Sequence, residues 1–493
     1  MRNNKIFAIK REAPFSMEEM IMLSALIVFM VSAVINSGFI HPDEHFQILE
    51  FARWKMGIAT PQAMAWEHVA KIRPTLQPVF AMIMIRLFLW FGLENPFHQA
   101  IAIRMITGLI MLNSLWWFTK AAGRYVNPHH RNGLMAATLF FWMVPMISVH
   151  FSSETMSTAC LLLLLDCLLR MEKPSVRGAI WMGVVAALGF EFRYQLAFAF
   201  VGILAWILAV GRYRWRIWCM AVMGFLGVTA LCTVLDCWFY GRFVFAPYNY
   251  YYMNIVRHVA ALFGESPWYT YILLLAMSPG GALGVPILIS ICAGTFRHYR
   301  NPVVWTFWAF LFFHSIISHK ELRFLFPLMP MLPLFMVWAY EMIRPMQYRL
   351  VGVTLIGMLV FINVGGLVHV AFKPADNGKA VMMQYLCARA SEQEKNPRVK
   401  AHRGSNPFRT GPLIAQFYMW QPVDINEDSW DSTEDEKDYD IMVLRQVDWT
   451  DRELLLAKGY REVCRSIPLW QNTLNRFYHT YNPDRVLIAY EKR

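Results

Sequence analysis

The segment HPDEHFQ, residues 41–47, places two carboxylates between two histidines directly after an uncharged apolar run. A carboxylate in a partly desolvated cleft can serve as a general base, because burial raises its pKa towards neutrality. We interpret Asp43 as that base and Glu44 as its support. Two alternatives stay open. The acidic residues can occupy the first turn of a helix, or the histidines can bind a metal ion, although the proline between them disfavours a regular helical pair.

Two further segments carry polar side chains suited to a sugar. In AMAWEHVAKIRPTLQP, residues 63–78, Glu67 and Arg73 form a charged pair that can shape a ligand site just before the next apolar run. A later aromatic-rich segment contains Asp236 and Asn249, and such mixtures suit sugar faces and hydroxyls. The same aromatic residues also suit a membrane interface, so this segment alone decides nothing.

The segment SHKELRFLFPLMP, residues 318–330, compresses three cationic side chains into about one turn. His319, Lys320 and Arg323 are donors of the kind that a phosphate needs, and arginine offers a planar fork for two oxygens. The alternative is that these residues snorkel from a helix end to the membrane surface.

The elements that must position these residues are membrane helices. The chain has 493 residues, of which 57% are hydrophobic and only 16% charged, a balance typical of membrane proteins. Its net charge of +12 is spread over the ends of apolar runs rather than gathered in a patch, which disfavours a nucleic-acid partner. The apolar runs long enough to cross a bilayer are 18–40, 76–92, 98–119, 133–150, 154–170, 178–191, 195–211, 217–238, 269–294, 302–318, 324–343 and 350–372.

The basic residues predict an orientation for these spans. Residues 1–17 carry four basic residues and are expected in the cytoplasm, since Lys and Arg favour that side. Residues 41–75 then form the first extracytoplasmic loop of a transmembrane domain spanning 18–372. The alternation of later basic loops predicts about eleven to thirteen crossings in an all-α polytopic protein, with the C-terminus outside.

Residues 373–493 differ in composition from the rest of the chain. Short β-branched runs alternate with a helical-period run, which predicts a small extracytoplasmic α/β domain. Its two cysteines, Cys387 and Cys464, could pair in an oxidising compartment.

This topology brings the polar segments to one side of the membrane. Charged groups at membrane depth cost about 2.5–3.5 kcal/mol each unless they are paired or hydrated, so their gathering at one level indicates a water-accessible cavity. The alternative is a ring of ordinary interfacial charges.

In this order, the segments resemble glycosyltransferase family 22. HPDEHFQ, WEHVAKIRP, LDCWFYGRFVFAPYNYYYMN with FGESPWYTY, and SHKELRFLFPLMP match that family over roughly residues 35–345. Its members are multispanning mannosyltransferases of GPI-anchor assembly, including the enzyme of the third mannose, and of N-glycan assembly with α-1,2 and α-1,6 linkages. The pairing of HPDE with HKE-x-RF is specific to the family.

The resemblance implies the C-type glycosyltransferase fold, no cofactor, no metal and a dolichyl or polyprenyl phosphate mannose donor. Transfer with inversion to a glycan or glycolipid acceptor would occur on the extracytoplasmic or lumenal side of the endoplasmic reticulum or the bacterial inner membrane. Asp43 would be the general base, Glu44 would support it, and His319, Lys320 and Arg323 would hold the donor phosphate. The candidate substrate-binding residues are His41, His45, Glu67, Arg73, Asp236 and Asn249.

The chain departs from the family pattern in places. It has Trp66-Glu67-His68 and Arg73-Pro74 where the family has Trp-Glu-Trp and Arg-Ser, and it contains no N-x-S/T sequon. Two alternatives therefore stay open: transfer of another lipid-phosphate-linked sugar such as aminoarabinose or a pentose, and transport of a lipid-linked glycan. A transporter is expected to show inverted repeats and mid-membrane binding residues, which this sequence does not display.

Overall fold

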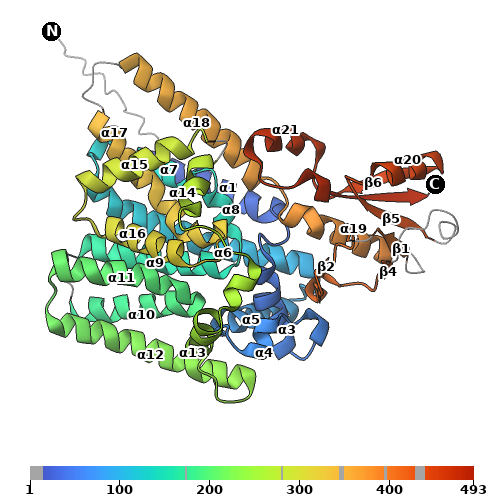
Figure 1. The fold of residues 1–493 in the computed structure, drawn as a ribbon, viewed down its shortest axis with the longest axis horizontal. Coiled ribbons are helices and arrows are strands. Elements are labelled where there is room, and N and C mark those ends of the chain that lie inside the picture. The colour runs from blue at the N-terminus through green and yellow to red at the C-terminus, as the bar shows by residue number, and fades with distance from the viewer. Residues whose placement is uncertain are drawn as a thin grey trace, which may run out of the picture.

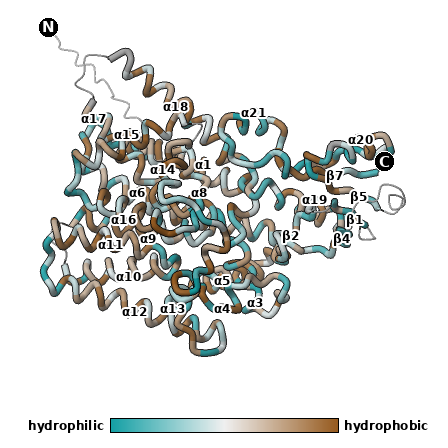
Figure 2. Tube along the Cα trace, viewed as in Figure 1, coloured by the Kyte–Doolittle hydropathy of each residue, from teal (hydrophilic) through white to brown (hydrophobic). Residues whose placement is uncertain are grey.

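The computed structural model describes residues 15–171, 175–278, 281–343, 349–392, 397–402, 404–427 and 439–492. A bundle of apolar helices forms one end of the molecule and a small mixed-sheet domain forms the other (Figure 1). Apolar residues dominate the bundle, whereas hydrophilic residues are frequent in the C-terminal domain (Figure 2). Most of the predicted cytoplasmic segment 1–17 and part of the acidic stretch after Asp424 lie outside the described residues.

The chain is a multi-pass membrane protein. Six described helices are long and apolar enough to cross a bilayer, and three apolar helices are shorter. The six are Met17–Ile35, Pro96–Tyr125, Tyr194–Gly211, Trp215–Tyr240, Leu322–Met342 and Gly352–Ala371, and the shorter three are Leu76–Trp90, Gly284–Arg297 and Pro302–Ile316. The count of eleven to thirteen crossings and the sides of the membrane stay predictions.

The sequence explains where a bundle helix begins and how closely two of the bundle helices pack. Helix α1 (Met17–Ile35) starts with a capping box, in which Ser16 and Glu19 satisfy each other's backbone amides. Helices α10 (Val176–Phe192) and α12 (Trp215–Tyr240) approach closely because glycines face the partner backbone. A Cβ atom at Gly183 would lie 1.9 Å from the carbonyl oxygen of Ala221, so only glycine fits there.

Two of the predicted spans are broken in the structure. The run 133–150 forms α7 (Arg131–Leu139) and α8 (Val144–Val149), because the chain leaves the helical conformation around Phe140. The run 269–294 forms α14 (Thr270–Met277) and α15 (Gly284–Arg297). A long apolar run therefore predicts burial in the bundle but not an unbroken helix.

The remaining helices complete the bundle and its loops. They are α2 (Pro42–Glu44), α3 (Glu50–Lys55), α4 (Trp66–Ala70), α5 (Leu76–Trp90), α6 (Pro96–Ala122), α9 (Ser153–Arg170), α11 (Ala197–Trp206), α13 (Ala246–Tyr251), α16 (Pro302–Ile316), α17 (Leu332–Ile343) and α18 (Arg349–Ala371). A 3-10 segment, Leu322–Met331, precedes α17. Helices α3 and α4 lie beside α5 at the lower edge of the bundle in this view, below the C-terminal domain (Figure 1).

The C-terminal domain is built on a five-stranded sheet of order β4-β1-β5-β7-β6. Strand β1 pairs in parallel with β4 and β5, and β7 pairs antiparallel with β5 and β6. Its elements are α19 (Lys379–Glu392), β1 (Arg398–Ala401), β2 (Arg409–Thr410), β3 (Leu413–Ile414), β4 (Asp424–Asn426), β5 (Ile441–Arg445), α20 (Trp449–Ala457), β6 (Tyr460–Arg465), α21 (Leu469–Tyr478) and β7 (Leu487–Lys492). Cys387 and Cys464 are both free thiols, so the disulfide considered from the sequence is not formed.

Candidate active site

The HPDEH segment forms the start of a continuous helical run after α1. His41 is the N-cap of α2, and its Nδ1 accepts the backbone N–H of Asp43 at 3.2 Å. The run continues through a π-helical segment, His45–Leu49, into α3. The helix-cap interpretation therefore holds, and it does not compete with a chemical role, because the cap fixes the backbone that carries Asp43.

Asp43 lies between two guanidinium groups from distant parts of the chain. Its Oδ2 is 2.9 Å from Nη2 of Arg323 and 3.5 Å from Nη2 of Arg73, and its Oδ1 is 3.4 Å from Nδ1 of His41. Burial opposes ionisation of this carboxyl, but Arg323, then His41 and Arg73, outweigh burial and hold the pKa of Asp43 well below its usual range. Asp43 is therefore a carboxylate at neutral pH.

Arg323 connects three carboxylates. Besides Asp43, its Nε donates to Oε2 of Glu321 at 2.5 Å and its Nη1 donates to Oε1 of Glu154 at 3.0 Å. The same Glu154 oxygen accepts from Nη1 of Arg193 at 2.8 Å. Charges of alternating sign thus run from Arg73 to Arg193, and each buried charge has an opposite neighbour, as a low-dielectric setting requires.

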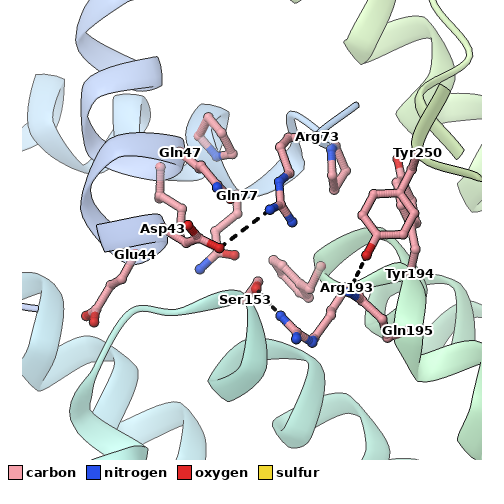
Figure 3. Close-up of a pocket in the computed structure, with 14 residues that line it drawn as sticks. Asp43, Glu44, Gln47, Arg73, Gln77, Ser153, Arg193, Tyr194, Gln195 and Tyr250 are labelled. Carbon is pink, nitrogen blue, oxygen red and sulfur yellow. Dashed lines mark hydrogen bonds and ion pairs between the residues drawn. The ribbon is translucent and has the colours of Figure 1, made fainter. Parts of the chain in front are cut away.

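A cavity opens beside this chain of charges (Figure 3). It is bounded by the helical run after His41, by the segment before α5, by the start of α9 and by the end of α10, with Tyr250 from α13 on the far side. The polar residues that line it include Asp43, Gln47, Arg73, Gln77, Arg193 and Tyr250. Carboxylate, guanidinium, amide and phenol groups can together bind a phosphorylated sugar and accept a proton from it or its partner.

Glu44 supports the site from behind rather than facing its centre. Its Oε1 lies 2.8 Å from Nδ1 of His150, and its Oε2 accepts the backbone N–H of Ile40 at 2.9 Å. The other ring nitrogen of His150 lies 2.7 Å from Oδ1 of Asn36. Asn36 in turn donates to the carbonyl oxygen of Val370 at 2.7 Å, which ties the loop to α18.

Other predicted residues lie around the site in supporting positions. Glu67 accepts from Nε2 of Gln47 at 2.8 Å and lies 3.4 Å from Nη2 of Arg73, and burial raises the pKa of its carboxyl. Nε2 of His41 is 3.3 Å from Oε2 of Glu321. These side chains hold the orientation of Asp43 and Arg73.

Of the two cations before Arg323, His319 shares Glu321 with Arg323, whereas Lys320 is directed to backbone carbonyls. Both ring nitrogens of His319 have acceptors, namely Oε1 of Glu321 at 2.8 Å and the Gly264 carbonyl oxygen at 3.0 Å. The Nζ atom of Lys320 donates to the carbonyl oxygens of Ser266 and Ile317. The structure therefore separates Lys320 from the cavity, because the extended chain before the 3-10 segment turns successive side chains in different directions.

Of the six predicted substrate-binding residues, Arg73 lines the cavity, whereas His41, Glu67 and three others do not. His45 is buried, with Nε2 2.9 Å from Oε1 of Glu50, and it does not converge with His41 on a shared metal site. Asp236 is buried and accepts from the backbone N–H and hydroxyl of Thr75 at 2.8 and 2.6 Å. Asn249 donates to the Lys71 carbonyl oxygen at 3.1 Å. Each residue fixes a loop near the site, which residue type and topology alone could not distinguish from substrate contact.

The C-terminal domain contacts the loop that carries Asp43. The backbone N–H of Phe417 donates to Oε1 of Glu50 at 2.7 Å, the same oxygen that faces His45. The ring of Tyr418 stacks on His45, with centroids 5.3 Å apart and planes 10° from parallel. The domain is thus packed against the loop that carries Asp43.

Sequence reasoning placed Arg193 among the charges expected at the outer ends of the spans, but it assigned no role to Arg193, His150 or Asn36. His150 and Arg193 lie at ends of spans on the predicted outer face, and this position is the sequence feature that could have indicated a site role. Asn36 ends an apolar run, where a lone amide is the sign of a buried hydrogen bond.

Comparison with known proteins shows the family to which the chain is similar. The model of the Alg9-like mannosyltransferase family matches residues 20–405. Mannosyltransferase APTG1 of Arabidopsis thaliana is 25% identical over 338 residues, which are 65% of this chain and 58% of that protein. GPI alpha-1,2-mannosyltransferase 3 of Bos taurus is 21% identical over 364 residues, which are 70% of this chain and 64% of that protein. The chain thus spans less than two thirds of the length of these relatives.

The fold has a counterpart among solved structures. ArnT from Cupriavidus metallidurans, solved bound to undecaprenyl phosphate, superposes with a TM-score of 0.56 over 96% of this chain and 97% of that chain, at 14% identity. This similarity confirms the predicted all-helical C-type glycosyltransferase fold with a small C-terminal sheet domain.

Proposed function

The chain belongs to the Alg9-like mannosyltransferase family, and from this premise we propose that it is an inverting mannosyltransferase. Its donor is mannose linked to a polyprenyl or dolichyl phosphate, and its acceptor is a glycan or glycolipid hydroxyl on the extracytoplasmic side. The observation that carries the proposal is the ionised Asp43, held at 2.9 Å by Arg323 on the wall of a cavity that Arg73 and Arg193 also line.

The reaction needs one base and one anion site. The acceptor oxygen bonds to the anomeric carbon while the bond from that carbon to the phosphate oxygen breaks, and the electron pair leaves with the lipid phosphate. Asp43 takes the proton of the acceptor hydroxyl. A carboxylate of low pKa suffices, because the hydroxyl becomes strongly acidic as its oxygen bonds to the anomeric carbon.

The positive groups around the cavity support a phosphate leaving group. Such a group needs positive charge rather than a proton donor, and fixed guanidinium groups stabilise the developing charge without reorganisation. Arg323 is the member of the predicted trio His319, Lys320 and Arg323 that reaches Asp43. We assign His319 and Lys320 to shaping this loop, since their donors bind Glu321 and backbone carbonyls.

The setting supports a lipid-linked donor. Apolar helices surround the site, so a polyprenyl or dolichyl chain can stay in the bilayer while its phosphate reaches the cavity. ArnT, which shares the fold, was solved with undecaprenyl phosphate. The membrane is that of the endoplasmic reticulum or a bacterial inner membrane.

A transfer assay with defined donors tests this proposal. Purified protein in liposomes receives a lipid-phosphate mannose of known anomeric configuration, together with a panel of glycan and glycolipid acceptors. We expect a mannosylated product whose new linkage, determined by proton NMR, has the opposite configuration. Transfer from a nucleotide sugar alone would contradict the lipid donor, and retention of configuration would contradict a single displacement. Movement of a lipid-linked glycan across the bilayer without any product would favour the transporter.

A further inference from the structure

The guanidinium group of Arg193 makes hydrogen bonds through Nη1 but none to the described residues along the edge formed by Nε and Nη2. Its Nη1 donates to Oε1 of Glu154 at 2.8 Å and to Oγ of Ser153 at 3.1 Å. Its Nε and Nη2 have no hydrogen-bond partner among the described residues, although both are shielded from solvent and the residue is only 4% exposed. An unsatisfied buried donor costs about 1–3 kcal/mol, and more when it is charged, so this edge indicates a missing ligand.

We propose that the free edge of Arg193 binds the phosphate group of the donor. The N–H bonds of Nε and Nη2 point in the same direction and form the planar fork that matches two oxygens of a phosphate. This inference rests on the proposed function, because the fork alone would also suit a carboxylate. It assigns the principal phosphate contact to α10 rather than to the segment His319–Arg323.

The other arginines of the site are less available. Arg323 uses all three of its nitrogens on Glu321, Glu154 and Asp43. Without displacing a carboxylate, a phosphate could reach at most the second N–H of Arg323 Nη1. Arg73 places its Nη2 3.5 and 3.4 Å from the oxygens of Asp43 and Glu67, and its Nε has no partner among the described residues. Because Nε shares its edge with the engaged Nη2, Arg73 can add single donors but not an open two-donor edge.

The surroundings hold the Arg193 fork in place. Its guanidinium lies over the Phe324 ring, 5.0 Å from the ring centroid, and Glu154 and Ser153 fix the opposite edge. Such a pre-oriented fork loses little entropy when it binds. Residue 324 follows Arg323 directly, so binding at Arg193 is coupled through packing to the group that holds Asp43.

The arrangement also separates the phosphate from the base. Asp43 and Arg193 lie on different walls of the cavity in Figure 3: Asp43 belongs to the helical run after His41, and Arg193 follows α10. An inverting displacement needs the attacking hydroxyl and the leaving phosphate on opposite faces of the anomeric carbon. Separate walls for a phosphate at Arg193 and a hydroxyl at Asp43 are compatible with this requirement.

Binding measurements separate this inference from the transfer reaction. The wild-type protein and its R193Q, R193K and R104Q variants are titrated in detergent with a polyprenyl phosphate, and in a second arm with inorganic phosphate, following tryptophan fluorescence. Arg104 is the matched control, because it is a buried arginine, bonded to the Ala33 carbonyl oxygen at 2.7 Å, that does not line the cavity.

The expected result is a graded loss. R193Q should weaken binding of polyprenyl phosphate about 10- to 100-fold, R193K should weaken it less because charge remains without the fork, and R104Q should bind like wild type. If R193Q does not fold, the loss in R193K still tests the fork. Binding within twofold of wild type in both Arg193 variants would overturn the inference and leave the proposed function standing. If the wild type does not bind polyprenyl phosphate, both this inference and the proposed function are overturned. If inorganic phosphate binds equally tightly and its binding also depends on Arg193, the assignment of this site to the lipid donor is overturned.

Discussion

The buried pair of Glu44 and His150 should contribute several kcal/mol to stability. Nδ1 of His150 faces the Glu44 carboxylate at 2.8 Å, and Nε2 faces Oδ1 of Asn36 at 2.7 Å. The Asn36 oxygen is an acceptor, because the amide nitrogen of Asn36 donates to the Val370 carbonyl oxygen. The Glu44 carboxyl, the His150 ring and the Asn36 amide thus form one buried hydrogen-bonded chain.

The magnitude follows from burial. The His150 side chain is 0% exposed, and removing its ring leaves Oε1 of Glu44 and Oδ1 of Asn36 without these buried partners, at about 1–3 kcal/mol each and therefore about 2–6 kcal/mol in total. His150→Ala should lose about that much. Glu44→Gln should lose less, because the amide still offers an acceptor. The double variant should be more stable than the sum of the two losses predicts by about 2 kcal/mol.

A double-mutant cycle measures this coupling. Unfolding in mixed detergent micelles, followed by tryptophan fluorescence, gives the free energy of unfolding for each variant. The matched control is the pair of His130 and Glu341, which lie 2.7 Å apart with side chains 16% and 23% exposed. Its coupling should stay below about 1 kcal/mol, since solvent screens such pairs. Equal coupling in the two cycles would refute a strong interaction between the buried Glu44 and His150 side chains.

Two other predictions concern the contacts around Asp43. Glu50→Ala should loosen the C-terminal domain, because the backbone N–H of Phe417 and Nε2 of His45 lose their buried acceptor, at about 2–4 kcal/mol. Limited proteolysis should then cleave the domain faster than in the surface control Glu392→Ala, and unchanged protection would refute the contact. Burial opposes ionisation of Glu321, but Arg323 holds the pKa of Glu321 at about 2. Since this is below the unfolded value of about 4.3, its contribution is present above that pH and is lost as pH falls towards 2. Glu321→Gln should flatten the fall of the unfolding midpoint between pH 5 and pH 3, and parallel curves for both proteins would contradict this.

The sequence predicted the centre of the site better than its surroundings. Asp43 and Arg323 are 280 positions apart, yet their motifs predicted that they would lie together, and they are 2.9 Å apart. The signal is physical: charges at the ends of membrane spans need opposite charges or water nearby. The same reasoning could not assign His45, because burial against the C-terminal domain depends on contacts that are distant in sequence.

The limits of sequence reasoning are also visible in Lys320 and Arg193. Lys320 is one of three adjacent cations, and only the conformation of the chain determines that it binds the carbonyl oxygens of Ser266 and Ile317. Arg193 follows α10, and its free edge depends on which of its nitrogens Glu154 and Ser153 occupy. The apolar run 133–150 predicted one helix, whereas the backbone forms two.

The rate of mannosyl transfer by Asp43→Asn tests the central claim most directly. Asparagine keeps the size of the side chain but cannot accept the hydroxyl proton, and loss of a general base lowers rates about 10²- to 10⁴-fold. The matched control is Asp166→Asn, which removes a carboxylate paired with Arg170 on α9, away from the cavity. We predict at least a hundredfold loss in Asp43→Asn, with polyprenyl phosphate binding retained and Asp166→Asn near wild type. Transfer by Asp43→Asn within a few-fold of wild type would contradict Asp43 as the base.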